Sequence, residues 1–380
     1  MARLVCFVVN PLAGIGGPLA LRGSDGSAGL EALRRGARLV SPERARVFAE
    51  ECKRLRLGER IVFLTASGVM GETPLSKAGF ASYHVVYHPD SWPTNPHDTM
   101  ETVRACIARG AEIVVFVGGD GTARDVVSAL HEVGAANTPI LGVPSGVKVY
   151  SSVFAENPRA AAHVLAEWLD HGTTCEGEVV DIDEDAFRAN MLRARLYTIA
   201  RTPCSPLMVG ASKQPTPSTE EEEENKRAIA RYLAENMEEC TLYILGPGTT
   251  VKAIADELGV EKTLLGVDVV HNRRLVAADV DEKTLYNIVA RHLEGGGRVK
   301  IVVTPIGGQG YIFGRGNQQI SPRILRLVGR DNIIVVATKS KLSKLKRLRV
   351  DTGDEKVDEM LRGYIRVVTD YGEETVVRVE

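Results

Sequence analysis

Short apolar runs alternate with segments of helical spacing through the first 172 residues. Runs at 4–9, 61–65, 113–117 and 140–143 have the length and composition of buried strands. Helical patterns lie between or after them, at 41–56, 98–109, 123–130 and 157–169, with Asp98 expected as the N-cap of the second. This alternation predicts a doubly wound, mostly parallel α/β sheet.

The pattern changes near residue 173. Antiparallel strands are predicted at 178–182 and 196–200, and a Pro- and Ser-rich stretch at 203–219 precedes an acidic run and a helix at 226–237. Further strands are predicted at 241–245, 264–270, 300–304 and 333–337, with a final hairpin over 364–379. We therefore expect an N-terminal domain at 1–172, a second mixed α/β domain at 173–335, and a C-terminal extension at 336–380 that packs back on either domain.

One glycine turn carries the clearest chemical signal. Gly118, Gly119, Asp120, Gly121 and Thr122 follow the strand at 113–117 and open a helix. The glycines let an anion approach the backbone, and the helix start presents N–H groups and a positive dipole end. A carboxylate here would repel a bare phosphate, so Asp120 predicts a metal ligand or a group that acts on an attacking hydroxyl. The structural alternative is a plain N-cap at Asp120.

A second glycine turn follows the first strand. Its backbone could form an anion nest, with Asn10 orienting a phosphate or a ribose hydroxyl, and the alternative is an ordinary turn. The predicted members are Asn10, Gly14, Gly16 and Gly17. Ser24 and Asp25 are predicted to contact substrate in the same pocket, and Ser145 is a further predicted substrate contact.

The second half contains three further candidates. Gly246, Gly248, Thr249 and Thr250 repeat the strand, glycine turn and helix arrangement, and form either an anion cradle or a structural turn. Asp268, at a strand end, could bind a hydroxyl or a metal, or cap a turn. The glycine-rich stretch 307–319 is either an Ω-type loop or a ligand contact, where Gln309, Asn317 and Gln318 would contact a ribose or a base and Arg315 a phosphate.

Composition narrows the class of protein. The chain has 380 residues and a net charge of −2, which gives no indication of a nucleic-acid surface. Its six cysteines lie far apart with no C-x-x-C pair, so we expect reduced thiols in a cytoplasmic protein and no disulfide framework. The apolar segment at 1–9 is too short for a membrane span, and we expect no membrane partner. The eight histidines show neither metal-ligand spacing nor a legible nucleophile set.

Taken together, the motifs resemble those of a known enzyme group. The Asn10 turn with Gly118–Thr122 looks like the NAD kinase and diacylglycerol kinase superfamily, which also resembles 6-phosphofructokinase in the Gly118–Thr122 turn. The whole chain is similar to an archaeal group described as ATP- or polyphosphate-dependent NAD kinases, through the motifs at 246–250, 264–268 and 304–319.

This resemblance implies a Rossmann-like N-terminal domain, a second domain and an active site in the cleft between them. It implies that Asp120 activates or orients the acceptor hydroxyl and holds Mg²⁺ or Mn²⁺, while Gly118, Gly119 and Gly121 hold phosphates. The donor would be ATP or polyphosphate, the acceptor the adenosine 2′-hydroxyl of NAD, the product NADP, and the enzyme a homo-oligomer.

The sequence departs from this family at two points. NAD kinases resemble one another in an Asn-Asp or Asn-Glu pair that binds the dinucleotide, whereas the nearest match here is Asn190-Met191. The second half also has a more α/β pattern than the β-sandwich usual in those enzymes. Two alternatives therefore stay open: a kinase of another small alcohol or lipid, and a nucleotide-sensing module without turnover.

Overall fold

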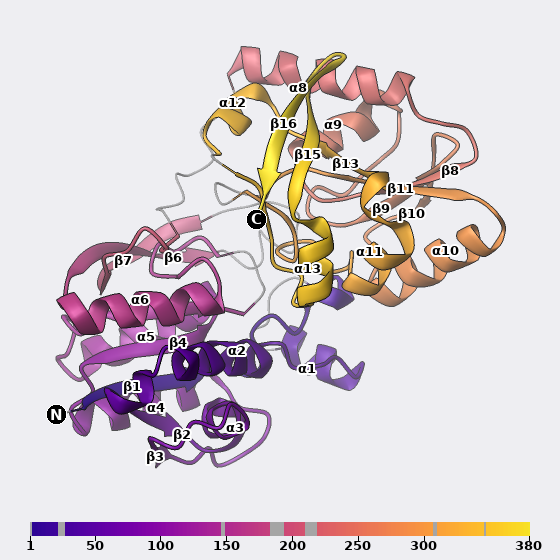
Figure 1. The fold of residues 1–380 in the computed structure, drawn as a ribbon. Coiled ribbons are helices and arrows are strands. Elements are labelled where there is room, and N and C mark those ends of the chain that lie inside the picture. The colour runs from indigo at the N-terminus through magenta and orange to yellow at the C-terminus, as the bar shows by residue number, and fades with distance from the viewer. Residues whose placement is uncertain are drawn as a thin grey trace. The chain divides into compact units, whose positions relative to one another are not determined.

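The computed structural model describes residues 2–21, 27–145, 149–182, 194–209, 219–306, 310–345 and 347–380. The chain forms two compact units (Figure 1). The first comprises Met1–Gly16 and Arg22–Ser212, and the second comprises Gly17–Leu21 and Lys213–Glu380.

The first unit contains a five-stranded parallel sheet with the order β3-β2-β1-β4-β5. Its strands are β1 (Arg3–Val9), β2 (Ile61–Ala66), β3 (Tyr83–Tyr87), β4 (Ile113–Gly118) and β5 (Ile140–Pro144). The chain moves outward from β1 to β3 and then crosses to the other side of β1 to form β4. The strand order therefore reverses between β1 and β4, which is where ligands bind in doubly wound sheets.

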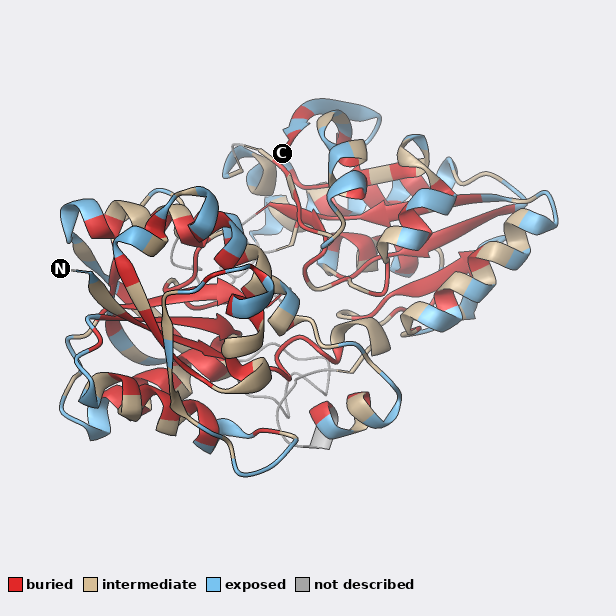
Figure 2. Cartoon of the chain, turned by 60° about the horizontal axis from the view of Figure 1, so that its bottom comes forward, coloured by how far each residue is buried: buried red, intermediate tan, exposed pale blue. Residues whose placement is uncertain are grey.

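Helices cover both faces of this sheet. Alternate residues of β1 point to opposite sides, so Phe7 packs with Phe48 and Leu165 on one face, whereas Val8 packs with Val103 and Val126 on the other. Figure 2 shows the buried strands of each unit between helices with buried inner faces. The helices are α1 (Ser27–Arg34), α2 (Ser41–Arg54), α3 (Glu72–Lys77), α4 (Pro96–Ala108), α5 (Asp120–Glu132) and α6 (Pro158–His171), with short 3-10 turns at Leu57–Glu59 and Gly68–Met70. The predicted doubly wound α/β fold is confirmed.

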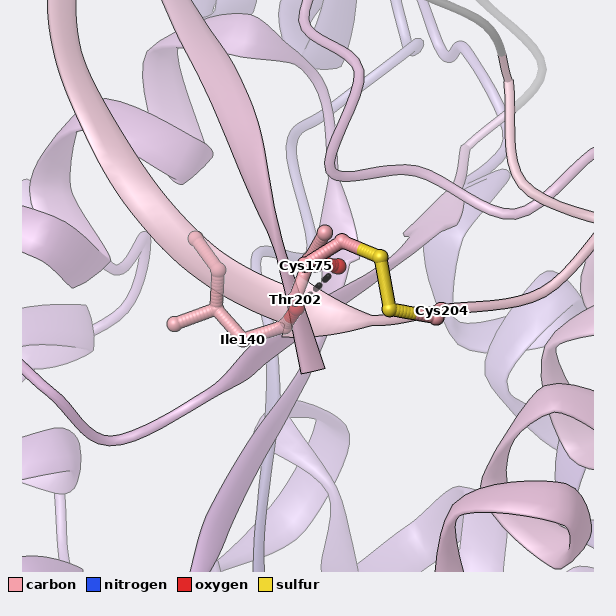
Figure 3. Close-up of a disulfide and its surroundings, with 4 residues drawn as sticks. All are labelled: Ile140, Cys175, Thr202 and Cys204. Atoms are coloured by element: carbon pink, nitrogen blue, oxygen red, sulfur yellow. Dashed lines mark hydrogen bonds between the residues drawn. A yellow bond between two sulfur atoms is a disulfide. The ribbon is translucent and has the colours of Figure 1, made fainter. Parts of the chain in front are cut away.

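An antiparallel hairpin completes the first unit. Strands β6 (Thr174–Ile182) and β7 (Ala194–Pro203) pair along their whole length, and the hairpin packs on α5 and β5. The Thr202 hydroxyl donates to the carbonyl of Ile140 in β5 at 2.8 Å (Figure 3). We expected a domain boundary at 172, but the compact units divide at 212, because this hairpin packs on the preceding sheet.

The hairpin also corrects the expectation that every thiol is reduced. Cys175 and Cys204 form a disulfide, with their Cα atoms 5.2 Å apart (Figure 3). The two residues are separated by 29 positions in sequence, and the antiparallel pairing of β6 with β7 brings them together. The other cysteines are free: Cys6, Cys52 and Cys106 are buried and Cys240 is exposed.

The second unit contains a seven-stranded mixed sheet with the order β10-β9-β8-β11-β13-β15-β16. Strands β8, β11, β13 and β15 are parallel, and antiparallel strands flank them at both edges. The strands are β8 (Thr241–Leu245), β9 (Asp268–His271), β10 (Arg274–Ala277), β11 (Arg298–Val303), β13 (Ile333–Val336), β15 (Gly363–Asp370) and β16 (Glu373–Val379), with β12 (Tyr311–Phe313) and β14 (Arg349–Val350) in a separate pair. Because β15 and β16 extend this sheet, the C-terminal extension expected at 336–380 belongs to the second unit.

Apolar residues fill both faces of the second sheet as well. Ile244 and Ile301 face one core cluster, and Leu245 and Val302 face the other, together with Ile254 of α9. The helices are α8 (Glu220–Glu235), α9 (Thr249–Glu257), α10 (Glu282–Glu294), α11 (Pro322–Val328), α12 (Lys339–Ser343) and α13 (Glu355–Leu361), with 3-10 turns at Gly17–Leu19 and Arg330–Asn332. This unit is an α/β sheet with helices, as the sequence predicts.

A search for membrane-spanning segments in the described parts of the chain finds no helix that combines the necessary length and apolarity.

Candidate active site

Three loops of the first unit converge at the carboxyl ends of β1, β4 and β5. The loop after β1 is tied to the strand-end of β4, because the Asn10 N–H donates to the Val117 carbonyl at 3.0 Å. The loop after β5 is tied to β4 in the same way, through the Ser145 N–H and the Gly118 carbonyl at 3.1 Å. The sheet therefore brings together three of the segments that the sequence singles out.

The Asn10 side chain joins the first loop to helix α5. Its Nδ2 donates to Thr122 Oγ1 at 3.0 Å, and its Oδ1 accepts from the Leu12 N–H at 3.1 Å. Gly118 lies directly beside Thr122, since a Cβ atom on Gly118 would be 2.3 Å from Thr122 Oγ1. A glycine at 118 is thus required for Thr122 to meet Asn10.

Gly14 and Ser145 form the other side of this arrangement. Gly14 has a φ of +79°, and a Cβ atom there would lie 2.5 Å from the Ser145 carbonyl oxygen, so the close approach of the two loops needs glycine. The Ser145 side chain is fully buried, and its hydroxyl has no hydrogen-bond partner among the described residues. A buried hydroxyl without a partner is costly in a folded protein, and a bound ligand would satisfy it.

Asp120 is the first residue of α5, and it does not cap the helix. The N-cap is Gly119, which has no side chain with which to cap the helix. The Asp120 carboxylate instead accepts hydrogen bonds from the segment after β5: Oδ1 from the Ser151 N–H at 2.8 Å and the Ser151 hydroxyl at 2.6 Å, and Oδ2 from the Tyr150 N–H at 2.9 Å. The plain N-cap, which was the structural alternative for Asp120, is therefore not what the geometry shows.

The Asp120 carboxylate lies in a buried environment. Asp120 is 8% exposed, and Ser151 is fully buried. Burial, and then the charge of Asp120, raises the pKa of the Tyr150 phenol far above its ordinary range, so this hydroxyl stays protonated. Tyr150 and Ser151 are not predictable from the sequence alone, because a Tyr-Ser-Ser sequence carries no functional signal of its own.

These residues can accept a divalent cation only as part of a larger complex. Mg²⁺ is commonly held by one or two carboxylates together with phosphates of a substrate. Asp120 offers one carboxylate at a helix start, which fits that arrangement. In the described ranges, no group of three or more His, Cys, Asp or Glu side chains is placed to hold a metal by itself.

Four predicted substrate contacts lie outside the described residues. They are Ser24, Asp25, Asn190 and Gln309. Their roles stay predictions.

The glycine turn of the second unit also joins a strand to a helix. Helix α9 begins at Thr249 after Gly248, which has a φ of +119°, and Gly246 closes onto β11 through its N–H and the Val302 carbonyl at 2.9 Å. A Cβ atom on Gly248 would lie 2.6 Å from the Thr304 methyl group. Thr249 is exposed at the helix start and Thr250 is buried. Both interpretations of this turn, an anion cradle and a structural turn, fit these contacts.

The stretch after β11 divides into buried and accessible parts. Arg315 is 1% exposed, stacks on the Tyr311 ring at 4.0 Å and lies 3.3 Å from Asp351, so its charge is already matched by a carboxylate. Asn317 is fully buried and donates to the Ile312 carbonyl at 2.8 Å. Gln318 is half-buried and packs against Gly17, where a Cβ atom would be 2.9 Å from its side chain. Within this stretch, the contacts of Arg315 and Asn317 favour a structural loop, and a ligand contact at Gln318 stays a prediction.

Asp268 lies in a buried ion pair. Both side chains of the pair are fully buried, with Lys262 Nζ 2.9 Å from Asp268 Oδ2. The Thr263 hydroxyl donates to the same carboxylate at 2.9 Å, and the Asp279 N–H donates at 2.8 Å. These partners support the alternative in which Asp268 is a structural group that holds the loop before β9.

We expect Asp268→Ala to lower the free energy of unfolding by about 3–5 kcal/mol, because it leaves the Lys262 ammonium buried without its counter-charge. Burial already lowers the pKa of Lys262, and Asp268 opposes that shift. Urea unfolding of the full chain measures the change. The matched control is Asp256→Ala, which breaks the exposed Lys252–Asp256 pair and should cost about 0.5 kcal/mol or less. Wild-type stability of Asp268→Ala, combined with a loss of substrate affinity, would contradict the structural role.

Comparison with known families identifies the family of the chain. Residues 5–173 match the ATP-NAD kinase N-terminal domain, and residues 238–379 match the ATP-NAD kinase C-terminal domain. A search of curated proteins found no match. The two family matches together span most of the chain and include the loops that surround Asp120. The chain belongs to the NAD kinase superfamily and is a kinase, a phosphotransferase that acts on an alcohol acceptor.

Proposed function

We propose that this kinase transfers a phosphoryl group from ATP or polyphosphate to the adenosine 2′-hydroxyl of NAD and so forms NADP. The observation that carries the proposal is the Asp120 carboxylate, which is buried and oriented at the start of α5, at the point where the strand order reverses. The two family matches support NAD and ATP as the substrate classes.

The glycine turns would bind the phosphates of the donor. The first backbone N–H groups of α5 and its dipole attract an anion, and Gly118 and Gly14 allow close backbone packing around it. The unpartnered Ser145 hydroxyl would donate to a phosphate or ribose oxygen. Helix and loop donors of this kind are positioned before the substrate arrives, which lowers the cost of charge reorganisation in the transition state.

Asp120 would orient the acceptor hydroxyl. Phosphoryl transfer passes through a loose transition state in which positioning and charge neutralisation supply most of the rate enhancement. A carboxylate whose oxygens accept hydrogen bonds from Tyr150 and Ser151 is held in a fixed rotation, which suits an orienting role. A bound Mg²⁺ or Mn²⁺ would neutralise phosphate charge when present, with Asp120 as its protein ligand.

A product screen by mass spectrometry tests the acceptor and the donor together. ATP and polyphosphate, each with Mg²⁺, are paired with NAD, NADH, nucleosides, small sugars and a diacylglycerol. We expect a product from NAD that is one phosphoryl group heavier than NAD. A phosphorylated product from another acceptor, with none from NAD, would favour the small-alcohol or lipid kinase. Binding of NAD by calorimetry without transfer from either donor would favour a sensing module.

A further inference from the structure

The Ser151 hydroxyl links Asp120 to the β6–β7 hairpin. A serine hydroxyl has a single proton to donate, and here it points to Asp120 Oδ1 at 2.6 Å. The same oxygen accepts a hydrogen bond from the Val180 N–H of β6 at 3.0 Å. Ser151 is fully buried, so solvent water does not compete for either bond.

Through these two hydrogen bonds, Ser151 can fix the orientation of a charged group. Hydrogen bonds to a charged acceptor are shorter and stronger than neutral ones, and a buried site strengthens them further. The hydroxyl and the N–H groups of Tyr150 and Ser151 together fix the rotation of the Asp120 carboxylate. Because Val180 holds the Ser151 oxygen, the position of the carboxylate also depends on β6.

The neighbouring serine provides an internal comparison. Ser152 Oγ accepts from the Glu178 N–H at 2.7 Å, and the Ser152 N–H donates to the Glu178 carbonyl at 2.9 Å. Ser151 and Ser152 therefore bind the same strand through the same type of contact. Among the described residues, only the Ser151 hydroxyl also reaches Asp120.

We propose that Ser151 is a positioning residue for phosphoryl transfer. It fixes the orientation of the Asp120 carboxylate relative to strand β6, because its hydroxyl bonds to both. The proposal rests on the proposed function of Asp120. It adds a requirement that the hairpin be docked for the carboxylate to be correctly oriented.

The test compares Ser151→Ala with Ser152→Ala in the full chain, using the acceptor identified in the product screen. Loss of a charge-assisted hydrogen bond should lower kcat of Ser151→Ala by about 10- to 100-fold. KM for donor and acceptor should stay within about threefold, since the phosphate-binding backbone is unchanged. Ser152→Ala should keep kcat close to that of the wild type, with an unfolding midpoint similar to that of Ser151→Ala.

Two further measurements separate positioning from a general loss of structure. In the Asp120→Asn background, Ser151→Ala should cause no additional loss of residual activity, because its effect passes through the carboxylate. Ser151→Cys keeps a donor at the site that is weaker and carried by a larger atom, and it should have a kcat between wild type and Ser151→Ala. Ser151→Cys carries the test by itself should Ser151→Ala fail to fold.

The outcomes distinguish this inference from the proposed function. Equal kcat values for Ser151→Ala and Ser152→Ala, with Asp120→Asn inactive, would overturn the role of Ser151 and leave that of Asp120 intact. An additive loss from Ser151→Ala in the Asp120→Asn background would also overturn it. Full activity of Asp120→Asn would instead remove the proposed function itself.

Discussion

Asp120→Asn is expected to lower turnover by about 10²- to 10⁴-fold while the chain keeps its fold, because the carboxylate orients the reacting hydroxyl and supplies the negative charge for a metal ion. Asparagine has nearly the same size and keeps one oxygen that can accept from Ser151. Steady-state product formation measures the loss. Circular dichroism and urea unfolding of the same sample establish that the fold is retained.

The matched control for this change lies at the other end of the same helix. Glu132→Gln removes a carboxylate of α5 that is half exposed and pairs with Arg104 on the surface. It should leave kcat within about twofold of the wild type, because exposed ion pairs contribute little. Turnover of Asp120→Asn near that of Glu132→Gln would contradict the role of Asp120.

The second large effect is expected from Gly118→Ala. The added methyl group would lie 2.3 Å from Thr122 Oγ1 and 2.5 Å from Thr122 Cβ, and these atoms belong to the first turn of α5. Thr122 must then move, which breaks its hydrogen bond with Asn10 and displaces the loop that would hold the donor phosphates. We expect kcat/KM for the donor to fall by about 100-fold, since small displacements of a positioning group cost about that much.

Gly295→Ala controls for the effect of adding a methyl group to a glycine. Its Cβ would meet only backbone oxygens, at 3.5 Å, which is an ordinary contact. Donor kinetics of this variant should match those of the wild type. A Gly118→Ala enzyme with wild-type donor kinetics would show that the contact between Asn10 and Thr122 is not needed for donor binding.

Local features of the chain were the most predictable. Helix α6 begins where the pattern at 157–169 predicts: the Asn157 side chain accepts from the Ala160 N–H at its start, and Gly172, with a φ of +64°, follows its end. These signals are local, because a cap needs only residues within one turn. The predicted N-cap of α4 was wrong by one turn. Asn95 and not Asp98 is the N-cap, and Asp98 completes the capping box at the third helical position.

Features that depend on contacts between distant segments were not predictable. The disulfide between Cys175 and Cys204 follows from the pairing of β6 with β7, which the spacing of cysteines does not reveal. The ion pair of Asp268 with Lys262 depends on how the loop before β9 folds back. The contact of Ser151 with Asp120 was not predictable for the same reason, because the two residues lie 31 positions apart in sequence and meet in the folded structure.

The candidate site contains both kinds of feature, a local motif and contacts between distant segments. The Gly118–Thr122 turn could be identified because a strand, a glycine turn and a helix are consecutive, and their geometry follows from the local sequence. The groups that orient Asp120 come from the segment after β5, so single-sequence patterns predict the carboxylate and not its support. Second-sphere contacts of this kind decide whether a functional group is held accurately.

The most direct measurement of the central claim is the fate of NAD incubated with ATP, Mg²⁺ and the wild-type chain, with Asp120→Asn run in parallel. Mass spectrometry gives the mass of the product, and phosphorus NMR assigns the position of the new phosphate. The account predicts NADP, phosphorylated on the adenosine 2′-oxygen, from the wild type and almost none from Asp120→Asn. NADP formed equally by both chains, or by neither while another acceptor is phosphorylated, would contradict it.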